Sequence, residues 1–105
     1  MRFVETPVFT RFIRGLLDDD QYRSLQMALV LRPQHGALIP GSGGLRKVRW
    51  GTTSKGKRGG LRIIYYWDVA NETFYMLFAY SKNQQGDLTD DQVRTVARLV
   101  REEFG

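Results

Sequence analysis

Basic side chains that could hold a phosphate are concentrated in the middle of the chain. From Gln21 to Trp67 there is no Asp or Glu, while nine basic residues fall there: Arg23, Arg32, Arg46, Lys47, Arg49, Lys55, Lys57, Arg58 and Arg62. A guanidinium offers a phosphate a bidentate fork, and an ammonium offers a mobile point charge. The segment from Arg46 to Arg62 is therefore predicted to bind a polyanion, and RNA is the polyanion that we expect.

Three of these residues are predicted to share one face of a β-sheet. The run 45–50 (LRKVRW) is typical of a half-exposed strand, in which Lys47 and Arg49 point to one face and Arg46 to the other. In a suitable register, Arg62 on the next strand joins Lys47 and Arg49. Like charges gathered this closely destabilise the free protein, and the sequence places no acid beside them. The cluster is interpreted as a phosphate site; the alternative is a solvated basic face without a ligand.

A glycine-rich basic loop is expected between these two strands. The stretch from Gly51 to Gly60 interleaves glycines with Lys55, Lys57 and Arg58. Such a backbone is conformable enough to follow a nucleic-acid strand, so these three residues and Arg46 are predicted to bind RNA. The G-x-x-x-x-G-K-[ST] spacing of a nucleotide P-loop is absent. The alternative is a flexible hairpin loop that binds nothing.

Few side chains are available to move a proton if the RNA is cut. His35 is the only histidine, which excludes a two-histidine mechanism, and it is expected to be a surface residue without a role. Cleavage would depend on Lys, Arg and Tyr: cations stabilise the charge that develops as a 2′-hydroxyl attacks the adjacent phosphate. A lysine whose pKa is lowered by neighbouring cations could serve as the base. Tyr80, at the end of a predicted strand, is the candidate for a functional tyrosine.

No metal or other cofactor is expected. A metal-dependent nuclease needs clustered carboxylates, and the acidic residues are confined to Glu5, the run Asp18–Asp20 and the stretch from Asp68 onward. The run Asp18–Asp20 is interpreted as a helix N-terminus, where negative charge is favourable. The chain has no cysteine, which excludes a thiolate nucleophile and a Cys-based zinc site.

The apolar pattern predicts a helical hairpin in the N-terminal third. A short strand at Phe3–Val4 precedes a helix that Thr6 and Pro7 open, and its apolar residues are Val8, Phe12 and Leu16, with Phe9 and Ile13 beside them. A second helix follows Asp18–Asp20, ends before Pro33, and has the apolar stripe Tyr22, Leu25 and Leu29.

The remainder predicts a sheet and a final helix. Strands are expected at 45–50, 61–67 and 73–80, and Thr89 with Gln92 forms a capping box that opens the last helix. The order is β-α-α-β-β-β-α. We therefore predict an α+β fold, a small antiparallel sheet packed against the N-terminal helical hairpin and the C-terminal helix.

Length and composition indicate an ordinary globular domain. The 105 residues are expected to form a single domain, 1–105, and 42% apolar with 26% charged residues argues against disorder. There is no run of about 18 apolar residues that could span a membrane, and the N-terminus does not resemble a signal peptide. The lack of cysteine fits a reducing, cytoplasmic location.

Several segments of the chain resemble a known toxin family. The runs Gly43–Arg49 (GGLRKVR) and Gly56–Tyr66 (GKRGGLRIIYY), with the later Tyr80–Asn83 (YSKN) followed by Asp87–Thr89 (DLT), look like the HigB branch of the RelE-like toxins, in the RelE/ParE superfamily. With the predicted helices, the resemblance covers nearly the whole chain. It implies a RelE-like fold and the toxin of a type II toxin–antitoxin system.

The resemblance also implies an activity, partners and residue roles. Such toxins enter the ribosomal A site, where ribosomal RNA surrounds them, and cleave mRNA as metal-independent endoribonucleases; a HigA-like helix-turn-helix antitoxin neutralises them. Arg62 looks like the arginine that contacts the scissile phosphate, and Lys47 and Arg49 look like its paired base and charge stabiliser. Lys82 looks like the basic residue after the last strand, with Tyr80 as a further catalytic candidate. Asn83, where better-known relatives carry an arginine, is expected to bind RNA.

Two other functions remain open from the residues alone. A non-catalytic module could bind RNA or the ribosome and block translation without cutting the message. Alternatively, the basic face could only dock an acidic protein partner. The charge distribution supports binding in all three interpretations, whereas cutting is supported mainly by the resemblance.

Overall fold

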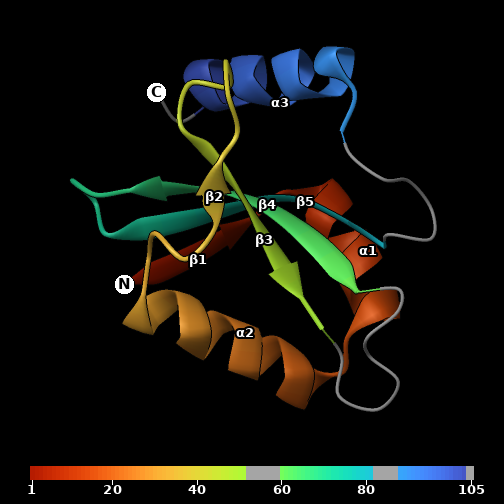
Figure 1. Cartoon of the computed structure of the whole chain (residues 1–105). Helices are drawn as coiled ribbons and strands as arrows, with labels where there is room; N and C mark the ends of the chain where they lie inside the picture. The colour runs from red at the N-terminus through yellow and green to blue at the C-terminus, as the bar shows by residue number, and fades with distance from the viewer. Residues whose placement is uncertain (52–59, 82–87, 104–105) are drawn as a thin grey trace.

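The protein forms an α+β fold, which confirms the predicted fold class. The structure, a computed structural model, describes residues 1–51, 60–81 and 88–103. In these residues a five-stranded sheet has the order β1-β5-β4-β3-β2. Along the chain the elements are β1 (Arg2–Glu5), α1 (Pro7–Leu16), α2 (Asp19–Leu31), β2 (Ala37–Leu38), β3 (Leu45–Trp50), β4 (Leu61–Asp68), β5 (Thr73–Ser81) and α3 (Asp90–Glu103). Figure 1 shows α2 and α3 on opposite sides of the sheet.

The sheet is mixed rather than purely antiparallel. The strands β3, β4 and β5 pair antiparallel, as predicted, and β2 joins β3 in the same way, but β1 pairs parallel to β5, with Phe3 opposite Phe74. The sequence also gave no signal for β2, which has only two residues. Both differences concern short strands whose partners are chosen by contacts distant in sequence, so no local apolar pattern reports them.

The structure shows which of the apolar residues expected on the first helix are buried. Phe9 and Ile13 are the buried residues of α1, whereas Val8 and Phe12 are each 38% exposed. The two stripes are adjacent on the helix and both are apolar, so periodicity alone does not choose between them. The choice follows from the sheet, against which Phe9 and Ile13 pack with Leu17.

The second helix agrees with its sequence signals. Asp18 is the N-cap, and its carboxylate accepts a hydrogen bond from the Gln21 N–H at 2.7 Å while the Gln21 side chain accepts one from the Asp18 N–H at 3.0 Å. The interpretation of Asp18–Asp20 as a helix N-terminus is confirmed. Leu25 and Leu29 are fully buried and pack in the same apolar cluster as residues of β3 and β4, so α2 covers the sheet on the face opposite α3.

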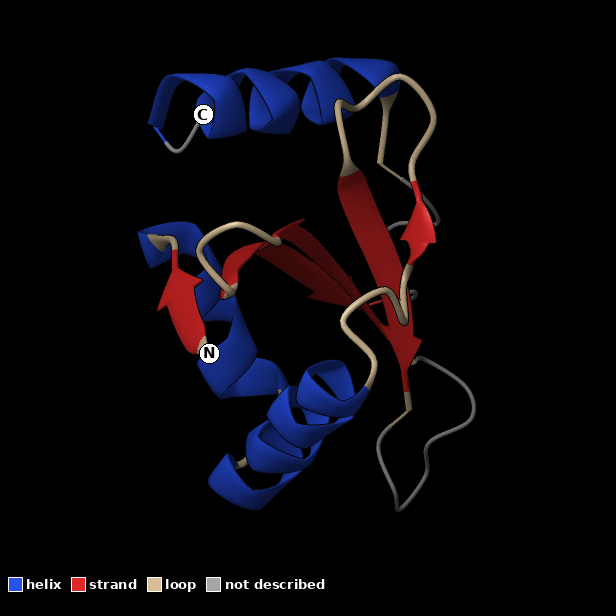
Figure 2. Cartoon of the chain, turned by 90° about the vertical axis from the view of Figure 1, so that its left-hand side faces the viewer, coloured by secondary structure: helices blue, strands red, loops and turns tan. Residues whose placement is uncertain are grey.

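Two apolar layers cover the two faces of the sheet. The α1/α2 face holds the larger layer, whose fully buried members include Phe9, Leu25, Leu29, Ile63, Tyr65, Phe74 and Met76. The α3 face holds Leu45, Ile64, Leu77, Tyr80, Ala97 and Val100. Figure 2 shows α3 on its side of the sheet, away from α1 and α2. Strands buried on both sides explain the continuous apolar runs in β4 and β5.

The last helix begins as its capping box predicts. The Thr89 hydroxyl accepts a hydrogen bond from the Gln92 N–H at 3.1 Å, and the Gln92 side chain accepts one from the Thr89 N–H at 2.9 Å. In the described part of the chain, no helix has the length and apolar character needed to cross a membrane.

A β-bulge in β5 is held by the cap of α1. Ile64 pairs with Phe78 and Tyr65 with Met76, so Leu77 is an extra residue in β5. The Thr6 hydroxyl donates to the Leu77 carbonyl at 2.9 Å and accepts from the Phe9 N–H at 3.0 Å, while the Thr6 N–H donates to the Met76 carbonyl at 3.1 Å. One residue therefore caps the helix and satisfies the irregular strand.

Replacing Thr6 should destabilise the fold more than the loss of an ordinary cap would. Thr6→Ala leaves the Phe9 N–H and the Leu77 carbonyl without their partner, and we expect a loss of about 1–2 kcal/mol in the free energy of unfolding. Thr6→Ser keeps the hydroxyl and serves as the control. Urea denaturation followed by far-UV circular dichroism measures both. Equal stability of the alanine and serine variants would contradict this assignment.

Candidate functional site

Strand register places four predicted site residues together on the α3 face. Arg49 on β3 is directly opposite Arg62 on β4, and Arg62 is directly opposite Tyr80 on β5. Directly opposite residues point to the same face of a sheet, so these three form a row across it, here called the basic row. Lys47 lies two residues before Arg49 on β3, paired with Ile64, and therefore points to the same face.

Arg62 is the most unusual member of the basic row. Its side chain is 8% exposed, and among the described residues its Nε atom is buried without a hydrogen-bond partner. Its Nη1 atom has only a long contact, 3.5 Å, to the Gly60 carbonyl oxygen. A buried guanidinium is costly unless it is paired, and an anion that reached this site would supply the missing acceptor.

Acidic side chains do not compensate this charge within the described ranges. The ion pairs found there join Arg23 to Asp20 and Arg94 to Asp91, both between neighbours on a helix surface. Among the described residues, no ion pair therefore neutralises the positive charges of Arg49 and Arg62. These charges can attract a phosphate, and the paired arginines offer it several donors.

Tyr80 belongs to the row but not to its surface. It is 2% exposed, its hydroxyl is buried, and it packs in the apolar layer under α3. Its ring lies 5.8 Å from that of Phe78. The phenol could reach a bound substrate only if the residues that cover it moved, so its catalytic role stays a prediction.

Arg46 points to the other face and is engaged there. Its Nη1 atom donates to the Gly36 carbonyl at 2.7 Å and has a longer contact, 3.5 Å, with the Gln34 carbonyl. The guanidinium thus holds the loop between α2 and β2. The structure separates Arg46 from the basic row, although both were predicted from the same run of charges.

Five other predicted residues lie outside the described part of the chain. They are Lys55, Lys57 and Arg58, predicted to bind RNA, with Lys82 as a catalytic candidate and Asn83 as an RNA contact. Their roles stay predictions.

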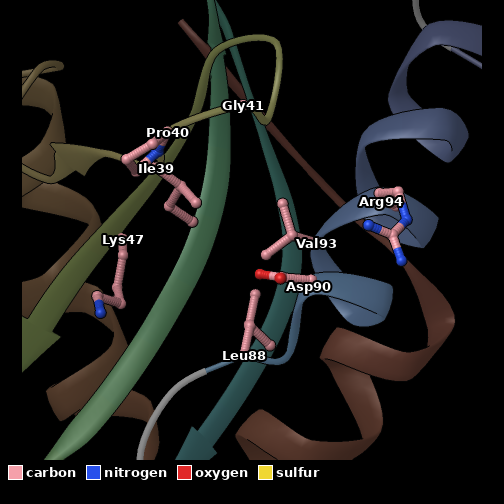
Figure 3. A pocket seen from close by; sticks show the side chains of 8 residues that line it. All are labelled: Ile39, Pro40, Gly41, Lys47, Leu88, Asp90, Val93 and Arg94. Carbon is pink, nitrogen blue, oxygen red and sulfur yellow. The ribbon is translucent and has the colours of Figure 1, made fainter.

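Two hollows meet at Lys47. A cleft of about 550 Å³ runs along the edge of the sheet and includes His35, Lys47 and Arg49 among its lining residues. A pocket of about 440 Å³ lies between the 39–41 loop and the start of α3, and Figure 3 shows Ile39 and Lys47 on one side of it and Asp90 and Val93 on the other. Lys47 lines both, so the two hollows adjoin at its side chain.

His35 is a residue whose position the sequence did not reveal. Its exposure agrees with the expectation of a surface residue, but it lines the same cleft as Lys47 and Arg49. The loop that carries it is held by Tyr65, whose hydroxyl accepts from the Gly36 N–H at 2.9 Å and donates to the Pro33 carbonyl at 2.8 Å. Burial raises the pKa of Tyr65 above its ordinary value. In the sequence, the signal that could have indicated a close approach of this loop to another segment was Gly36, which follows the only histidine.

The chain also matches a known protein family over nearly its whole length. The sequence model of the RelE toxin, of the RelE/RelB toxin–antitoxin system, covers residues 1–104. The match therefore includes every helix and strand described above and the whole basic row, and it does not depend on the cationic segment alone.

The loop before β2 should tolerate no side chain at position 36. A Cβ atom on Gly36 would lie 2.9 Å from both the carbonyl carbon and oxygen of Lys47 and 3.0 Å from the Tyr65 ring. We expect Gly36→Ala to lower the free energy of unfolding by about 1–3 kcal/mol, because backbone cannot move aside as a side chain can. Gly15→Ala, where nothing lies within 4 Å, is the matched control and should stabilise α1 by roughly 0.5–1 kcal/mol. Thermal denaturation distinguishes the two; an unchanged Gly36→Ala variant would refute the close approach.

Proposed function

The chain belongs to the family of RelE toxins of toxin–antitoxin systems, and on that premise we propose that it is an endoribonuclease that cuts mRNA in the ribosomal A site. The cut requires the ribosome and no metal ion. Its site of action is the cytoplasm, where messages are translated. The substrate is single-stranded there and can lie along the cleft and pocket that meet at Lys47.

The observation that carries this proposal is the pair of arginines facing each other across β3 and β4. Arg49 and Arg62 hold two like charges directly opposite, and the buried Nε atom of Arg62 lacks an acceptor among the described residues. A fold does not gain stability from such an arrangement. A phosphate placed over the basic row would gain donors from both guanidinium groups and relieve their repulsion.

The proposed chemistry is a transfer of the phosphate from one oxygen of the RNA to another. The 2′-hydroxyl oxygen attacks the adjacent phosphorus and gives its proton to a base, the new O2′–P bond forms, and the P–O5′ bond breaks as the 5′ oxygen takes a proton from an acid. Negative charge grows on the non-bridging oxygens during this step. Arg62, Arg49 and Lys47 stabilise that charge, since fixed donors are worth most where charge develops.

The finer family assignment is also a proposal. The segment GKRGG-x-R-x-x-YY, which ends in Tyr65 and Tyr66, supports the HigB branch. Membership of a toxin–antitoxin family implies a neutralising antitoxin as a partner, and for this branch we propose a small HigA-like helix-turn-helix protein. Its open reading frame is expected beside that of the toxin.

Removing an arginine of the basic row should abolish cutting while leaving other basic surfaces intact. We expect Arg49→Ala to reduce mRNA cleavage about 100-fold or more in a cell-free translation extract, with RNA ends mapped by primer extension. Arg49 is exposed, so this variant should fold. Arg98→Ala removes the same charge from the exposed surface of α3 and is the matched control. Arg62→Ala should lose activity as completely, with its folding checked by circular dichroism.

Two results would overturn the enzyme proposal. If the wild-type protein stops translation but leaves the message intact, it is a non-catalytic translation inhibitor, an alternative that the buried hydroxyl of Tyr80 favours. If the wild-type protein neither cuts RNA nor sediments with ribosomes at low salt, the basic row serves only a protein partner.

A further inference from the structure

We propose that His35 is the general base of the cleavage reaction, the group that takes the proton from the 2′-hydroxyl. This inference rests on the proposed endoribonuclease function and names a catalytic residue for it. Three observations support it: the place of His35 beside the basic row, the fixation of the loop that carries it, and the chemistry of the groups that line the cleft.

The edge of the sheet brings His35 to the end of the basic row. Ala37 on β2 is opposite Lys47 on β3, and Leu38 is opposite Arg46. Continuing this antiparallel register by two residues places position 35 across from position 49. The shared cleft agrees with that extrapolation, because His35, Lys47 and Arg49 all line it. His35 thus lines the same cleft as Arg49, at the edge of the sheet away from β4.

The backbone around His35 is fixed from both sides. The His35 N–H donates to the Arg32 carbonyl at 2.9 Å. The Tyr65 hydroxyl bridges the Pro33 carbonyl and the Gly36 N–H, and Arg46 donates to the Gly36 carbonyl. Surface loops are usually mobile, yet in this one a buried tyrosine and an arginine bind the residues on either side of 34–35, Pro33 and Gly36.

Close packing sets the distance between this loop and β3. A Cβ atom on Gly36 would meet the Lys47 backbone at 2.9 Å, so the loop lies directly against the strand that carries Lys47 and Arg49. A group fixed in this way is already oriented when the substrate arrives, which is what proton transfer requires.

The described residues that line this cleft include three with ionisable side chains, His35, Lys47 and Arg49, and of these three only the imidazole can accept a proton without first losing one. An ammonium and a guanidinium have donors and no acceptor, whereas a neutral imidazole has one free ring nitrogen. His35 therefore takes the 2′-hydroxyl proton as the O2′–P bond forms. Lys47 gives a proton to the 5′ oxygen as the P–O5′ bond breaks. The products are a 2′,3′-cyclic phosphate and a 5′-hydroxyl, and exchange with water restores both groups.

The test removes the imidazole and then returns it. We expect His35→Ala to cut mRNA on purified translating ribosomes about 100-fold or more slowly than wild type, as is typical for loss of a general base. Its circular dichroism, thermal stability and ribosome affinity should match those of wild type, because His35 is exposed and its backbone contacts remain. Adding free imidazole should restore a measurable part of the rate. Gln34→Ala, a neighbouring exposed side chain, is the control and should cut normally.

The outcomes separate this inference from the proposed function. If the wild-type protein does not cut RNA, the proposed function and the role of His35 fail together. If the wild-type protein cuts and His35→Ala cuts equally fast, only the role of His35 is refuted. If His35→Ala is slow but weaker in ribosome binding and unaffected by imidazole, His35 is a binding residue and the general-base assignment is overturned.

Discussion

The pairing of Arg49 with Arg62 across two neighbouring strands is the interaction that the rest of the structure has to support. Two cations directly opposite each other cost roughly 0.2–1 kcal/mol, and more as one of them becomes buried. Burial of a single leucine or phenylalanine contributes about 1.5–3 kcal/mol. The fully buried residues on both faces of β4, such as Ile63, Ile64 and Tyr65, can therefore hold the two strands in this register against the repulsion.

Alternation along β3 divides the basic residues between two tasks. Arg46 faces the α1/α2 side and binds loop carbonyls, whereas Lys47 and Arg49 face the α3 side beside Arg62. Neighbours in sequence with the same charge thus point to different faces: Arg46 holds the loop, and Lys47 and Arg49 are the residues proposed to bind a phosphate. A tyrosine on the adjacent strand supports the same loop from the same side as Arg46.

Much of this arrangement could be predicted from the sequence because its signals are local. The bounds of β3 follow from its alternation, and Asp18, Thr89 and Gln92 mark helix ends by hydrogen bonds within four residues. The face that α1 buries could not be predicted, because both of its candidate stripes are apolar. The parallel pairing of β1 and the two-residue β2 depend on distant contacts.

The candidate site shows the same division. The shared face of Lys47, Arg49 and Arg62 could be expected from strand alternation, subject to register. The position of His35 could not, since it depends on a loop that Tyr65 and Arg46, far along the chain, hold in place. The opposite face of Arg46 was expected, but its engagement with that loop was not.

The extra residue in β5 determines which face of the sheet each later residue of that strand points to. Side chains alternate strictly along a regular strand, so without the bulge at Leu77 the residues after it would exchange faces. Tyr80 would then point toward α1 and α2, and Ala79 would stand beside Arg62. The extra residue, whose carbonyl accepts a hydrogen bond from Thr6 near the N-terminus, thereby places Tyr80 rather than Ala79 opposite Arg62.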